Sequence, residues 1–180
     1  GTFHGLAHRL LRMHWQEAQL SQHFQILDAD DQQRLIKRVI ATLNLNEEQW
    51  PAKQAQWFIN AQKDEGLRPH QIVDYGDLYK KTMVRIYQAY EELCARNGVI
   101  DFAELILRSY ELFIQHPDLL THYQTRFRHI LVDEFQDTNG LQRDLMRTLA
   151  LARGANLFIV GDRKQSIYGF RGADVDVFRE

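Results

Sequence analysis

Two short apolar runs near the C-terminal end of the chain constrain its fold more than any other feature. Residues Ile130–Val132 and Leu157–Val160 consist of Ile, Leu, Val and Phe, and a polar segment follows each run. Continuous apolar runs of this length are typical of parallel strands that are buried on both faces. Parallel neighbours need a crossover, and the stretch between the runs has a helical pattern. We therefore predict a strand, helix, strand unit with buried strands.

The first polar segment, Asp133–Asn139, reads D-E-F-Q-D-T-N. Ligands of parallel α/β sheets bind beyond the carboxyl ends of the strands, where this segment begins. In phosphoryl transfer one acid can hold magnesium, and a neighbouring carboxylate can orient and deprotonate the attacking water. Asp133 and Glu134 fit these two roles. The alternative is that the two acids only end the strand and cap the next helix.

The second polar segment, Gly161–Asp174, combines side chains suited to phosphate and to nucleobases. Gln165 can hydrogen-bond a phosphate oxygen or the attacking water, and Arg171 can make bidentate bonds to phosphate. Tyr168 and Phe170 offer rings on which bases can stack. One short loop is thus predicted to contact both a nucleotide and a nucleic acid.

Together with G-T-F-H at residues 1–4, these segments resemble motifs of the UvrD/Rep/PcrA family of superfamily-one DNA helicases. The middle of the chain is similar to the bacterial UvrD branch through F-Q-I-L-D, Q-K-D-E-G-L-R-P and D-F-A-E-L, at Phe24–Asp28, Gln62–Pro69 and Asp101–Leu105. In the second polar segment Phe170 stands where UvrD usually has tryptophan, and this loop is also similar to RecB and AddA relatives.

The resemblance implies a role for each matched residue. Asp133 would be the Walker B acid that binds magnesium, and Glu134 would be the catalytic base. Gln165 would sense the terminal phosphate and share in catalysis, while Arg171 would lie near the nucleotide and link it to the DNA track. The expected contacts with single-stranded DNA are Thr2, Phe3, His4, Tyr168 and Phe170. For His4 a purely structural role is the alternative.

The implied cofactors are ATP and Mg²⁺, and the implied activity is 3′ to 5′ movement on single-stranded DNA. Implied partners are single-stranded DNA, duplex junctions and proteins of repair or replication. The chain contains no G-x-x-x-x-G-K-[ST] phosphate loop. We therefore expect an interior piece of a longer helicase that is inactive alone as an ATPase. The alternatives are a single-stranded DNA-binding module and a partner-binding scaffold without catalysis.

The fold class implied is α/β: a partial RecA-like P-loop NTPase motor core with a large all-helical inserted subdomain. Helical periodicity from Phe24 to Gln124 agrees with such an insertion. The expected segments are 1–23 for the start of the motor core and a lead-in helix, 24–126 for the inserted subdomain, and 127–180 for the motor core. The partial sheet is expected to have exposed edges.

Composition and residue spacing limit which kinds of protein and of binding site this chain can form. With 44% hydrophobic residues the chain can form a core, and its net charge of −2 means that any DNA contact depends on a local track. Cys94, the lone cysteine, is expected to be a buried small hydrophobe, which fits a bacterial cytoplasm. The chain has no membrane-length apolar run and no zinc-like histidine spacing. Aromatic residues at helical spacing are expected in the core: Tyr75, Tyr79, Tyr87, Tyr90, Tyr110 and Phe113.

Overall fold

The computed structural model describes residues 1–133, 135–150 and 156–160. Helices dominate this part of the chain, and the strands form two short parallel pairs. In chain order the helices and strands are α1 (Phe3–Met13), β1 (Gln25–Ile26), α2 (Ala29–Thr42), α3 (Ala52–Asp64), the 3₁₀ helix η1 (Pro69–Gln71), α4 (Leu78–Asn97), β2 (Val99–Ile100), α5 (Phe102–Gln115), α6 (Pro117–Arg126), β3 (His129–Val132), the 3₁₀ helix η2 (Phe135–Asp137), α7 (Gly140–Ala150) and β4 (Asn156–Ile159). None of the helices in the described part has the length and apolar character that a membrane span requires.

Local capping signals set the starts of several helices. Asp28 accepts a hydrogen bond from Asp31 N at 2.7 Å and caps α2, and Asp101 accepts one from Glu104 N at 2.7 Å and caps α5. Helix α1 begins at Phe3. Thr2 caps it, so the G-T-F-H motif forms its first turn and does not precede it.

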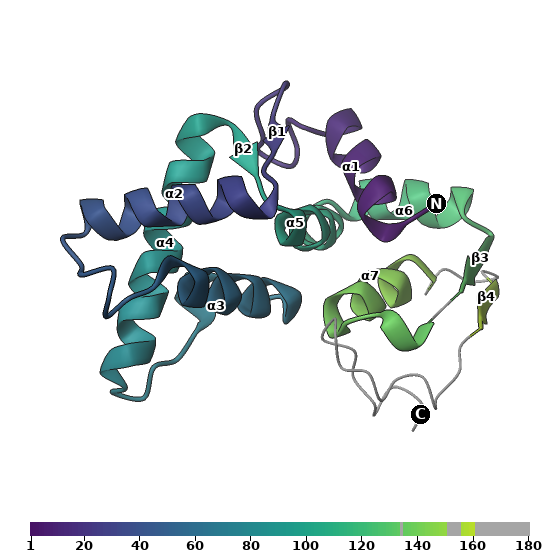
Figure 1. Ribbon diagram of the computed structural model, residues 1–180. Coiled ribbons are helices and arrows are strands. Elements are labelled where there is room, and N and C mark those ends of the chain that lie inside the picture. The colour runs from purple at the N-terminus through teal and green to yellow at the C-terminus, as the bar shows by residue number, and fades with distance from the viewer. Residues whose placement is uncertain (134, 151–155, 161–180) are drawn as a thin grey trace.

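Helix α5 lies at the centre of the molecule (Figure 1). It packs against α1, α6 and α7 and, on its other side, against α3, which in turn packs with α2 and α4. On one side it shares a core with α1, α6 and α7, in which Leu11, Leu105, Leu107 and Leu112 are almost fully buried. This core draws side chains from all three of the segments expected from the sequence. The segment boundaries themselves stay a prediction.

A second core fills the space between α2, α3 and α4. Tyr87 and Tyr90 are fully buried in it, as predicted, and so is most of Cys94. The prediction that Tyr75 and Tyr79 are also core residues is wrong. Tyr75 lies in the turn before α4 and is 90% exposed, while Tyr79 stacks on Trp50 at the edge of the core, with 5.4 Å between the ring centroids.

The prediction of an all-helical region between residues 24 and 124 needs one correction. Strands β1 and β2 pair in parallel within it, with Gln25 opposite Val99 and Ile26 opposite Ile100. Each strand leads directly into an aspartate-capped helix, so the pair fixes the starts of α2 and α5 side by side. Pairing of two residues is too short to produce a period-2 pattern that a sequence could reveal.

The predicted strand, helix, strand unit is confirmed as β3, α7 and β4, with the two strands parallel and Val132 opposite Ile159. The prediction that both faces of these strands are buried is wrong. Val132 packs against Phe135 and Met146 on one face, whereas Leu131 on the other is 72% exposed. The reason is that the described packing against this sheet comes from α7, η2 and Phe3, all on one face.

Candidate functional site

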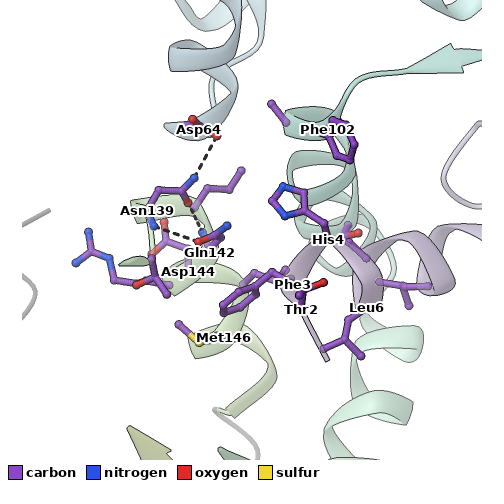
Figure 2. A pocket seen from close by; sticks show the side chains of 18 of the residues that line it. Thr2, Phe3, His4, Leu6, Asp64, Phe102, Asn139, Gln142, Asp144 and Met146 are labelled. Atoms are coloured by element: carbon purple, nitrogen blue, oxygen red, sulfur yellow. Dashed lines mark hydrogen bonds between the residues drawn. The ribbon is translucent and has the colours of Figure 1, made fainter. Parts of the chain in front are cut away.

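A single open cleft of about 2350 Å³ brings together segments from opposite ends of the chain. One part of its wall is the first turn of α1, with Thr2, Phe3 and His4, and another is the loop after β3, with Asp133 and residues 137–139. The C-terminal half of α3 and the start of α5 also line it. Figure 2 shows these walls around the side chains of Phe3 and His4.

Thr2 and Phe3 have clear structural contacts within the G-T-F-H turn. The Thr2 hydroxyl accepts a hydrogen bond from Gly5 N at 3.1 Å and so caps α1. Phe3 is half-buried and packs against both the α5 core and the cluster of Val132, Phe135 and Met146 beneath the Asp133 loop (Figure 2). Phe3 therefore connects α1 physically with the strand end that bears Asp133.

His4 lies on the cleft wall beside the ring of Phe102. Its imidazole meets Phe102 edge to face, with 6.0 Å between centroids and an interplanar angle of 77°. Burial lowers the pKa of His4, so the ring is neutral at pH 7. Phe102, in the D-F-A-E-L motif, is 53% exposed and lines the same cleft. The motif was visible in the sequence, but the exposure of its ring was not.

As predicted, Asp133 stands beyond the carboxyl end of β3. It is exposed and lines the cleft. Val160 N donates to Val132 O at 2.8 Å, and Phe135 N donates to Val160 O at 3.1 Å. The loop after β3 and the end of β4 are therefore held together by backbone hydrogen bonds. Five further predicted site residues lie outside the described residues: Glu134, Gln165, Tyr168, Phe170 and Arg171.

The capping position of α7 belongs to Asn139 rather than to Asp133. Asn139 Oδ1 accepts from Gln142 N at 2.9 Å, and Gln142 Oε1 accepts from Asn139 N at 3.2 Å. Thr138 is buried, and its hydroxyl donates to Phe135 O at 2.7 Å. Thr138 and Asn139, at the end of the D-E-F-Q-D-T-N segment, thus fix the shape of the loop between η2 and α7.

The same asparagine joins this loop to the helical region. Asn139 Nδ2 donates to Asp64 Oδ1 at 3.1 Å across the cleft (Figure 2). Asp64 is the last residue of α3, and α3 directs this end toward α7 (Figure 1). Burial, with repulsion from Asp101 as a smaller cause, raises the pKa of Asp64 to about 6.

We expect Asp64→Asn to stabilise the chain increasingly as the pH rises from about 4 to 7. The pKa of Asp64 is higher in the folded chain, about 6, than the value near 3.8 of an exposed aspartate. The folded state therefore binds the proton more tightly, and the contribution of Asp64 to stability is present below pH 3.8 and lost as the pH rises through 6. Asparagine does not ionise, so Asp64→Asn avoids this loss. At pH 7 we expect its free energy of unfolding to exceed that of the original chain by about 1 kcal/mol after allowance for solvent screening.

Urea unfolding of both proteins at several pH values between 4 and 7.5 measures this difference. Asp74→Asn is the control, because Asp74 lies in an exposed turn where its carboxylate accepts a hydrogen bond from Gly76 N at 2.9 Å. A difference between Asp64→Asn and the original chain that stays constant with pH would contradict the prediction.

Next to Asp64, Lys63 is buried within a network of charges. Its Nζ lies 2.7 Å from Asp101 Oδ2 and 2.9 Å from Glu104 Oε2. Tyr90 donates its hydroxyl hydrogen to the same Asp101 oxygen at 2.8 Å. Burial alone would lower the pKa of Lys63, but the two carboxylates outweigh it and hold the pKa above its usual value. Lys63 is therefore a permanent cation between α3 and α5.

Arg68 extends this network from the loop after α3. It binds Glu104 at 2.8 Å and Glu111 at 2.6 Å, and it also contacts Glu91. Burial opposes ionisation of Glu104, yet Lys63, Arg108 and Arg68 together hold its pKa well below the usual range. The two motifs at 62–69 and 101–105 thus bind each other through ion pairs. These ion pairs explain why the motifs contain charged residues, and the sequence spacing alone does not reveal them.

The donor set of the cleft suits magnesium held mainly by a nucleotide. Within the described part of the chain no group of three or more His, Cys, Asp or Glu residues could hold a metal ion. Magnesium in nucleotide sites commonly takes only one or two protein carboxylates and completes its shell with phosphate oxygens and water. Asp133, as one exposed carboxylate at a strand end, fits that requirement.

Comparison with known proteins adds a family assignment to this geometry. The family described as "UvrD/REP helicase N-terminal domain" matches residues 1–180. The chain is 58% identical over 176 residues to a DNA helicase II of Salmonella typhimurium and equally identical to that of Escherichia coli K12, covering 98% of this chain and 24% of each relative. It is 39% identical to the ATP-dependent DNA helicase PcrA of Leuconostoc citreum, over 97% of this chain and 23% of that relative. The chain thus spans about a quarter of the length of these relatives.

Proposed function

Because the chain belongs to the UvrD/REP helicase family over residues 1–180, we propose that it is part of an ATP-dependent DNA helicase. This helicase couples hydrolysis of Mg-ATP to movement along single-stranded DNA, in the 3′ to 5′ direction, during repair or replication. The observation that carries the proposal is that Thr2–His4 and Asp133 line one and the same cleft. The motif proposed to contact DNA and the acid proposed to hold magnesium line the same cleft although they lie far apart in the sequence.

In this proposal four residues of the two polar segments act on the nucleotide, its magnesium ion or the attacking water. ATP supplies the phosphoryl group whose transfer to water releases the free energy. Asp133 holds the magnesium ion from the end of β3, and Glu134 takes the proton of the attacking water. Gln165 orients that water and senses the terminal phosphate. Arg171 binds near the nucleotide, where a fixed guanidinium can form bidentate bonds to phosphate.

Phe3 and the Asn139–Asp64 contact are the structural support for coupling between the two motifs. Phe3 packs directly beneath the Asp133 loop, so a shift of the first turn of α1 on binding DNA displaces the packing of that loop. Asn139 and Asp64 connect the same loop to the helical region at 3.1 Å. Packed elements transmit such shifts because cores do not compress. Single-stranded DNA is the proposed ligand of Thr2, Phe3, His4, Tyr168 and Phe170, and duplex junctions are the proposed place of action.

The fold proposal is a partial RecA-like core, formed by residues 1–23 and 127–180, with residues 24–126 inserted as a mainly helical subdomain. The parallel β3–β4 pair with its crossover helix supports it. The chain has no G-x-x-x-x-G-K-[ST] loop to hold the phosphates. We accordingly propose that these 180 residues alone do not hydrolyse ATP, and that the activity belongs to the longer protein.

Phe102 is exposed on the cleft beside His4, and we propose that it too stacks on a base of single-stranded DNA. We expect Phe102→Ala to weaken binding of single-stranded DNA by the full-length helicase about 5- to 150-fold, because a stacked base contributes about 1–3 kcal/mol. Fluorescence anisotropy with a labelled oligonucleotide at low salt measures the change. Ile114→Ala is a matched control, since Ile114 is on the same helix, is 54% exposed and lies outside the cleft. Equal affinities of Phe102→Ala and the original protein would remove Phe102 from the DNA track.

A further inference from the structure

Trp57 is the large ring of α3 that does not take part in either core. The core-facing side of this helix consists of Ala52, Ala55, Gln56, Ile59 and Lys63. Trp57 is instead 63% exposed, whereas Trp50 nearby is half-buried against Tyr79. A large exposed ring stabilises the fold little, so packing in a core does not explain why a tryptophan occupies position 57.

The side of α3 that bears Trp57 is the side that faces the cleft. Trp57, Asn60, Ala61 and Asp64 all line it. Their spacing of three, four and seven residues places them in one stripe along the helix. The cleft is the same one that Thr2, His4 and Phe102 line from α1 and α5. An indole on this stripe therefore continues the surface already assigned to DNA.

The charges along this stripe differ between its two ends. At one end the ammonium of Lys53 lies 5.4 Å from the centroid of the Trp57 ring. At the other end Asp64 binds Asn139 of the Asp133 loop. Seven residues of helix separate Trp57 from Asp64 by about 10 Å. The aromatic end thus has a neighbouring cation, and the acidic end lies toward the proposed magnesium site.

These features together match the chemistry of a single nucleic-acid strand. Bases stack on exposed rings without regard to sequence, and a lysine beside the ring is placed to neutralise the adjoining phosphate. A protein partner would also bury Trp57, but the cation beside the ring and the continuity with His4 and Phe102 favour a polyanion with aromatic bases.

We propose that Trp57 stacks on a base of single-stranded DNA and that Lys53 contacts the adjacent phosphate, so that the track extends from the G-T-F-H turn onto α3. This proposal rests on the proposed function and adds a binding site to it. In the full-length helicase Trp57→Ala is expected to weaken single-stranded DNA binding about 5- to 150-fold, and Trp57→Phe to preserve most of the affinity. Lys53→Gln is expected to reduce the slope of log K against log salt by about 0.7.

Photocrosslinking provides a direct positive test. Single-stranded DNA that carries 5-iodouracil, irradiated in complex with the full-length helicase and digested with trypsin, should crosslink to the peptide of residues 54–63, which lies between Lys53 and Lys63. Trp57→Ala should abolish this crosslink. The matched control is Tyr75→Ala, because Tyr75 is 90% exposed and lies outside the cleft, and this variant should leave affinity and crosslink unchanged. Circular dichroism checks that each variant is folded.

The outcomes separate this proposal from the proposed function. If Phe102→Ala weakens binding while Trp57→Ala does not and no crosslink maps to residues 54–63, the extension onto α3 is wrong and the helicase proposal stands. If Trp57→Ala and Tyr75→Ala weaken binding equally, the effect is not specific to the cleft and the extension is again wrong. A full-length protein that fails to bind single-stranded DNA would overturn both proposals.

Discussion

Lys63→Met is expected to lower the free energy of unfolding of this chain by about 3–5 kcal/mol, a large fraction of the stability of a typical domain. The methionine fills a similar volume but leaves Asp101 without the cation that lies 2.7 Å from it, while Glu104 loses one of its cations and keeps Arg68 and Arg108. Both carboxylates are almost completely buried, so water cannot replace the lost partner. Urea denaturation followed by circular dichroism measures the loss.

Two further variants test the explanation. Lys37→Met removes a lysine that pairs with Glu47 at 3.1 Å at the surface, and its effect should stay below about 1 kcal/mol. Adding Asp101→Asn to Lys63→Met should recover part of the loss, because asparagine still caps α5 and no longer carries an unpaired charge. A Lys63→Met effect no larger than that of Lys37→Met would show that the buried network does not stabilise the fold.

Glu134→Gln is expected to reduce the DNA-stimulated ATP turnover of the full-length helicase about 10²- to 10⁴-fold while nucleotide binding is retained. The amide preserves the shape of the side chain but cannot accept the proton of the attacking water. Steady-state phosphate release at saturating ATP measures turnover, and equilibrium binding of a fluorescent ATP analogue measures affinity.

Asp144→Asn serves as the control for this variant. Asp144 also lines the cleft and is exposed, but it lies within α7 and has no proposed part in the reaction. Turnover in Asp144→Asn should therefore stay near that of the original protein. Unchanged turnover in Glu134→Gln would contradict the assignment of Glu134 as the catalytic base. Loss of nucleotide binding would indicate a structural role instead.

Sequence patterns predicted the secondary structure well because the signals involved are local. Asp28 and Asp101 cap their helices through bonds to backbone groups three residues away, and the apolar runs at 130–132 and 157–160 became parallel neighbours. The same reasoning missed the β1–β2 pair, whose two residues per strand leave no pattern. It also placed Tyr75 in the core, because spacing alone does not reveal where a helix begins.

The candidate site was predictable only in part. Asp133 stands at the end of its strand, as the sequence indicated, since parallel strands place their carboxyl ends at one edge. The contacts of Asp64 with Asn139 and of His4 with Phe102 were not predictable, because the partners are far apart in the sequence. No local signal specifies which distant side chain will lie opposite.

Residue patterns were therefore enough to predict the helical middle of the chain, the parallel strand, helix, strand unit near the C-terminal end and the family, but not the β1–β2 pair. Tertiary structure alone decided which motif residues are buried together, as Lys63, Asp101 and Glu104 are, and which rings remain exposed on a shared cleft. The two kinds of interaction act over different separations along the chain. Capping and periodicity act over one or two turns of chain, whereas burial, ion pairing and the raised pKa of Asp64 arise from neighbours that only folding brings together.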